Sequence, residues 1–66
     1  MLSTRVTRSG TIIVQSRILG VWTDTQYTLV YDTSLHGYSV LFAGHTLVTM
    51  LATENIALSW ILENRY

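Results

Sequence analysis

The sequence predicts an α+β fold, a three- to four-stranded antiparallel meander with one C-terminal helix packed on one face. Apolar and polar residues alternate over 26–32 and again over 38–43, as in strands that have one covered face. After Thr53 the apolar spacing changes to that of a helix. No proline and no segment of linker composition interrupts the chain, so we expect residues 1–66 to form a single domain.

Residues 1–9 and residues 10–52 differ in pattern. The first nine residues are polar, and we expect them to form a flexible N-terminal arm. Residues 10–52 are expected to form the antiparallel strands. The predicted order is a strand over 11–22 with a bulge at Gly20, a turn at 23–25, a strand over 26–32, a loop at 33–36, a strand over 38–43, a two-residue turn at Gly44 and His45, and a strand over 46–52.

The loop at 33–36 predicts which side chains share a face of the sheet. A four-residue loop aligns the neighbouring strands so that the aromatic residues gather on one side, which we expect the helix to cover. This side holds Tyr27, Leu29, Tyr31, Tyr38, Val40 and Phe42. The opposite side carries apolar residues that one short helix cannot also cover, namely Val30, Leu41, Val48 and Met50.

The C-terminal helix is expected over 54–64. Thr53 is a favourable N-cap, and Glu54 places a carboxylate in the first turn, where the helix dipole favours negative charge. The residues at helical spacing that should face the sheet are Ile56, Ala57, Trp60 and Ile61. Leu58 and Leu62 lie outside that stripe and require a second apolar contact.

Size and composition both favour self-association. A domain of 66 residues buries only about 60% of the surface of its unfolded chain, so its stability as a monomer is expected to be marginal. Disulfides are excluded because the chain has no cysteine. Charged residues make up 12%, about half the usual share, so little polar surface is available for solvent. A second subunit is the remaining way to cover apolar surface.

The sequence contains no recognisable catalytic or cofactor motif. His36 and His45 fall in two different predicted loops, and no other histidine or cysteine could complete a metal site or a nucleophile–base pair with them. The glycines are isolated and form no phosphate-binding run. We therefore expect a protein that is not an enzyme and that uses no cofactor.

The start of the chain lacks the apolar core of a signal peptide, so we expect a cytoplasmic protein. Residues 33–53 carry no charge over 21 residues, which is long enough to cross a bilayer. Two histidines, two glycines and several hydroxyl residues interrupt that stretch, so no membrane contact is expected.

Two functions from different classes fit these observations. The first is a self-associating protein-interaction module, homodimeric or larger, that acts as a stoichiometric regulator or inhibitor of another macromolecule, of the kind that viruses and mobile elements encode. Its partners would be a second copy of itself and an unidentified protein, bound through either the sheet face with Val30, Leu41, Val48 and Met50 or the helix ridge with Leu58 and Leu62. The alternative is a dimeric DNA-binding protein with an N-terminal arginine arm, in which Arg5, Arg8 and Arg17 contact phosphates.

Overall fold

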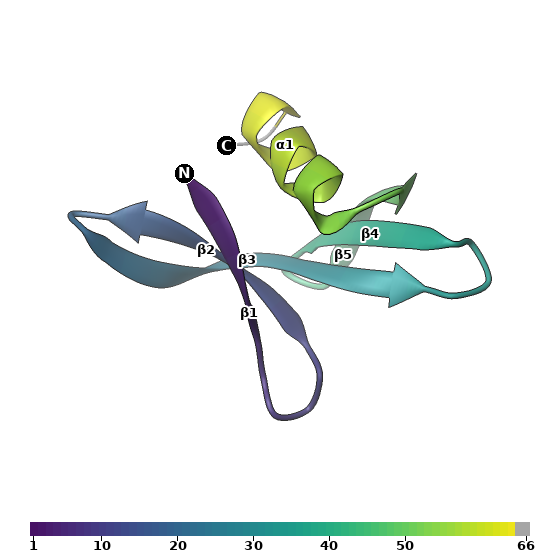
Figure 1. The fold of residues 1–66 in the computed structure, drawn as a ribbon, viewed down its shortest axis with the longest axis horizontal. Helices are drawn as coiled ribbons and strands as arrows, with labels where there is room; N and C mark the ends of the chain where they lie inside the picture. The colour runs from purple at the N-terminus through teal and green to yellow at the C-terminus, as the bar shows by residue number, and fades with distance from the viewer. Residues whose placement is uncertain (65–66) are drawn as a thin grey trace.

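The computed structural model describes residues 1–64, which form five antiparallel strands followed by one helix. The strands are β1 (Leu2–Val6), β2 (Ile12–Ile18), β3 (Val21–Asp32), β4 (Gly37–Phe42) and β5 (His45–Leu51), and the helix is α1 (Glu54–Asn64). They pair in chain order in one twisted sheet, and α1 packs against one face of it (Figure 1). The predicted α+β fold is confirmed, with five strands in place of three to four. Residues 65 and 66 of the predicted domain lie outside the described range.

The extra strand is β1, which lies in the segment expected to be an arm. It pairs with β2 without irregularity, from Leu2 opposite Ser16 to Val6 opposite Ile12. A short loop joins them, with Gly10 at φ 89° and the Thr7 amide donating to the Thr11 carbonyl at 2.9 Å. This is the geometry of a three-residue hairpin loop that ends in a left-handed residue. The expectation of an unpaired arm is therefore wrong.

The turn between β2 and β3 also differs from the prediction. The chain reverses at Leu19 and Gly20, both at positive φ, where a bulge within one long strand was expected. Residues 23–25, expected to be a turn, lie inside β3. The β2–β3 ladder is irregular opposite these residues, between Ile13 and Gln15. The Thr25 hydroxyl replaces ladder hydrogen bonds there: it donates to the Val14 carbonyl at 2.7 Å and accepts from the Tyr27 amide at 3.1 Å.

The β3–β4 hairpin has the predicted register. Asp32 pairs with Gly37 across the four-residue loop at 33–36, and the aromatic residues meet on one face. The ring centroids lie 4.8 Å apart for Tyr27 and Phe42 and 5.0 Å apart for Tyr31 and Tyr38. Tilted and edge-on aromatic pairs of this kind stabilise a fold by more than the burial of their apolar area alone.

A turn at Gly44 and His45 predicts that Phe42 faces Leu47, Val40 faces Thr49 and Tyr38 faces Leu51, and the β4–β5 hairpin keeps only the last of these pairs. Its turn is Ala43 and Gly44, both at positive φ, and lies one residue earlier than expected. Two irregularities in β5 then restore the alignment, so Tyr38 still pairs with Leu51 while Val40 pairs with Val48. Because Val40 is fully buried on the covered face, Val48 belongs to that face and not to the opposite one.

Helix α1 has the predicted bounds and cap. The Ile56 amide donates to the Thr53 hydroxyl at 3.1 Å, which satisfies one of the free amides of the first turn. The helix is rotated relative to the expectation: Ala57 and Ile61 are fully buried, Leu58 packs against the core, and Ile56 is exposed. The buried core is formed by Val14, Tyr27, Leu29, Val40, Ala57 and Ile61.

Candidate protein interface

The structure breaks up both predicted surfaces, the sheet face and the helix ridge, because each loses a residue to the core. Val30 and Met50 are exposed on the strands, and Leu62 is exposed on the helix. Leu41 is half-buried on the face that the helix leaves open, because it pairs with Thr28 out of phase with the buried residues. Val48 and Leu58 pack against the core. The structure thus divides the six residues among the open face, the β5 edge, the helix and the core.

A different set of exposed apolar residues lies at the end of the β2–β3 hairpin, with Ile18 and Val21 paired on one face, Trp22 on the other face and Leu19 in the turn. Ile18, Leu19, Val21 and Trp22 are all exposed, and the hairpin extends away from α1 (Figure 1). We name these four residues the hairpin tip. Sequence reasoning missed the tip because residues 11–22 were interpreted as one strand. The dipeptide Leu19-Gly20 between two apolar runs could have indicated the hairpin, since two-residue hairpin turns favour glycine.

Leu19 is unfavourable at this position for two separate reasons. Its side chain is 98% exposed, so it loses nearly all the free energy that burial of a leucine provides. Its backbone is left-handed, with φ 51°, which costs a residue other than glycine about 1–2 kcal/mol. Asparagine or aspartate would fit this turn better. Local stability therefore does not explain leucine here.

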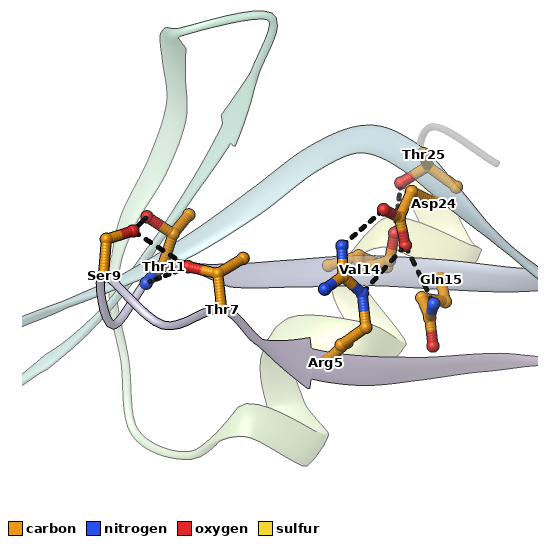
Figure 2. A network of polar contacts seen from close by, with 8 residues as sticks. All are labelled: Arg5, Thr7, Ser9, Thr11, Val14, Gln15, Asp24 and Thr25. Carbon is orange, nitrogen blue, oxygen red and sulfur yellow. Dashed lines mark hydrogen bonds and ion pairs between the residues drawn. The ribbon is translucent and has the colours of Figure 1, made fainter.

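A polar network ties three strands together on the open face (Figure 2). Arg5 of β1 donates to both carboxylate oxygens of Asp24 in β3, at 2.6 and 3.3 Å, and the Gln15 amide of β2 donates to Asp24 at 2.8 Å. These hydrogen bonds, first from Arg5 and then from Gln15, lower the pKa of the Asp24 carboxyl. The same pairing raises the pKa of Arg5. The network lies on the exposed surface and links β1, β2 and β3.

The three arginines proposed for phosphate binding do not converge. Arg5 is engaged with Asp24, Arg8 lies in the β1–β2 loop, and Arg17 lies near the far end of β2. The hydroxyls of the β1–β2 loop hydrogen-bond one another, Thr7 to Ser9 and Ser9 to Thr11, and these bonds do not involve Arg8 (Figure 2). A groove that follows a nucleic-acid backbone needs its cations in one track.

Within residues 1–64, no three histidine, cysteine or acidic side chains lie close enough to hold a metal ion. His36 is exposed in the β3–β4 loop, and His45 is exposed at the start of β5. One open hollow runs along α1, lined by Asn55, Ile56, Ser59, Trp60 and Glu63. It places Ser59 beside a carboxylate but beside no histidine, so it lacks the base of a nucleophile pair.

Over the described residues, α1 is too short and too polar to cross a membrane. No protein-family model matches the chain, and no curated protein or solved structure matches it.

Proposed function

We propose that this chain is a small, non-enzymatic interaction protein that self-associates and binds another protein in a fixed ratio, as a regulator or inhibitor does. The observation that carries the proposal is the hairpin tip, with Leu19 exposed and left-handed at its end. We expect the protein to act in the cytoplasm.

The tip suits insertion into an apolar pocket of a partner protein. It combines a large aromatic ring, Trp22, with three aliphatic side chains on a two-stranded support, and residues of this kind are frequent anchors of protein interfaces. Backbone strain held at an exposed site is typical of binding positions. Arg17 lies opposite Trp22 on the neighbouring strand and places a positive charge next to this anchor.

DNA binding through the arginines is the weaker alternative. It would require Arg5 to leave Asp24, and Arg8 and Arg17 lie toward opposite ends of β2. Titration with duplex DNA tests it directly. Affinity that falls steeply with salt would favour the arginines and count against the proposal, while no binding at low salt is the outcome we expect.

Partner capture with matched baits tests the role of the tip. Leu19→Asn removes the apolar end of the tip while giving the turn a residue that it prefers, so the fold should be at least as stable. Leu35→Asn makes the same change at an exposed leucine of the next hairpin. We expect the parent and Leu35→Asn baits to retain one protein from the native host in a fixed ratio. The Leu19→Asn bait should lose that protein. Identical retention by all three baits would contradict the proposal.

A further inference from the structure

The two edges of the sheet differ in how open they are to another strand. The β5 edge is interrupted twice, and Met50 within it has φ 65°, so the backbone there cannot offer an even row of hydrogen-bonding groups. The β1 edge is regular over all five residues and contains no proline, lysine or bulge, which often protect an edge; its one charged side chain, Arg5, is paired with Asp24. Among the described residues, β1 pairs with β2 alone.

The phase of the β1–β2 ladder identifies the backbone groups on the outer edge. The Thr7 amide points toward β2, because it donates to Thr11 at 2.9 Å. Backbone groups of successive residues in a strand point to alternate sides. Ser3 and Arg5 therefore also point toward β2, and the amides and carbonyls of Leu2, Thr4 and Val6 point outward.

The side chains of the same three residues lie on the helix-covered face. Thr4 pairs with the fully buried Val14, and its hydroxyl donates to the Glu54 carboxylate of α1 at 3.2 Å. Val6 is 64% exposed although it lies on this face. The outer edge of β1 thus combines outward backbone groups with one exposed apolar side chain, Val6, while Leu2 packs against the core.

We propose that β1 pairs antiparallel with β1 of a second copy, with Thr4 opposite Thr4 on a two-fold axis. This inference rests on the proposed self-association and assigns its interface. Leu2 of each copy then faces Val6 of the other, and Ser3 faces Arg5. The outward residues meet in three hydrogen-bonded pairs, about six bonds in all. The two sheets become one, with both helices on the same face.

Competing registers fail for physical reasons. A shift by one residue would set outward backbone groups against inward ones and exchange the covered and open faces. A shift that centres the pairing on Arg5 would place two arginines directly opposite each other, which is destabilising, and would leave Leu2 unpaired. Centring on Ser3 leaves Val6 unpaired. The Thr4 register alone pairs all five residues, and the Asp24 carboxylate in each copy compensates Arg5.

A disulfide at the two-fold axis tests the register, since the chain has no cysteine of its own. In Thr4→Cys the two Cα atoms would lie about 5.5 Å apart, within disulfide range. In the control Val6→Cys they would be offset by four residues, about 13 Å, which is out of range. Under mild oxidation Thr4→Cys should run at twice the monomer mass and Val6→Cys at the monomer mass. Cross-linking of Ser3→Cys or Arg5→Cys in place of Thr4→Cys would overturn the register.

A proline at the axis separates this interface from self-association in general. Thr4→Pro removes an outward amide, so the ladder to β2 stays intact. Thr4→Val loses the same contact to Glu54 but keeps the amide, and serves as the control. Light scattering should give half the parent molar mass for Thr4→Pro and the full mass for Thr4→Val, with unchanged circular dichroism. A dimeric Thr4→Pro would overturn the β1 interface while self-association stands, whereas a monomeric parent would overturn both.

Discussion

Gly37 lies directly against the backbone of Met50. A Cβ added at position 37 would come within 2.9 Å of the Met50 Cα and 3.0 Å of its carbonyl carbon. Met50 is left-handed, at φ 65°, in the irregular part of β5 between the residues paired with Tyr38 and Val40. The glycine thus makes room for the bulge that bends β5 and restores the pairing of Tyr38 with Leu51.

Gly37→Ala should destabilise the fold by about 1–3 kcal/mol, because backbone must move to admit the methyl group. Gly20→Ala is the matched control: it strains a left-handed backbone but meets no atom within 4 Å, so its cost should be about 1 kcal/mol. Urea unfolding measures both. A Gly37→Ala variant that unfolds at the same urea concentration as the parent would show that the close approach is relieved without cost.

The helix should depend most on Ile61. Trp60 is the largest of the residues that the sequence predicts to face the sheet, but it is half-buried whereas Ile61 is fully buried. Ile61→Ala should cost about 2–5 kcal/mol, and more than Trp60→Ala. The exposed neighbour Leu62, replaced by alanine, should change stability by no more than about 0.5 kcal/mol. The reverse order of Ile61 and Trp60 in thermal unfolding would show that the helix is rotated differently.

Deleting residues 1–9 should abolish cooperative unfolding. The deletion removes all of β1, the packing of Leu2 against the core and the hydrogen bond between Thr4 and Glu54. In a domain of this size, losing these contacts removes much of a small total stability. The flexible arm that the sequence predicts could be removed without loss of stability. The deletion therefore distinguishes a flexible arm from a paired strand. A truncated chain with a sharp thermal transition would support the flexible arm.

The Arg5–Asp24 pair should make stability dependent on acid. Because hydrogen bonds from Arg5 and Gln15 lower the pKa of Asp24 in the folded state, the stabilisation is present above the unfolded pKa of the carboxyl. It is lost as pH falls through the lowered folded value. Asp24→Asn should therefore be less stable than the parent at neutral pH and equal to it in strong acid. Since the pair is exposed, the difference should be small and should shrink in high salt.

Asp32→Asn is the control for that titration. The pKa of Asp32 is also lowered, by hydrogen bonds from the Ser34 side chain and backbone, so the parent loses stability there in acid as well. The Asp32→Asn variant should keep the loss of stability in acid that comes from Asp24. Parallel pH profiles for the parent and Asp24→Asn would contradict a stabilising role of the Arg5 pair.

Local patterns predicted the parts of the fold that depend on local chemistry. Thr53 and the helical spacing after it predicted α1, and the alternation on both sides of the loop at 33–36 predicted the register of β3 and β4. The β4–β5 register was wrong because Ala43 adopts a left-handed conformation and bulges in β5 then compensate. Such bulges depend on contacts between strands, as at Gly37, and leave no periodic signal.

The N-terminal strand and the hairpin tip could not be found from periodicity either. β1 is polar on its open face and carries only Leu2 and Val6 as apolar residues, so its pairing with β2 decides its structure. The tip was hidden because Leu19 is an unusual residue for a left-handed turn, and propensity placed it in a strand. The candidate interface thus changed from the predicted patch to the tip and the β1 edge.

The molar mass of the intact protein in solution tests self-association most directly. The monomer has a mass of 7.5 kDa. Light scattering at micromolar concentration should report about twice that mass, and the value should fall on dilution, as expected for a dimer in exchange with its subunits. A stable mass of 7.5 kDa across the whole concentration range would contradict the dimer and the β1 interface together.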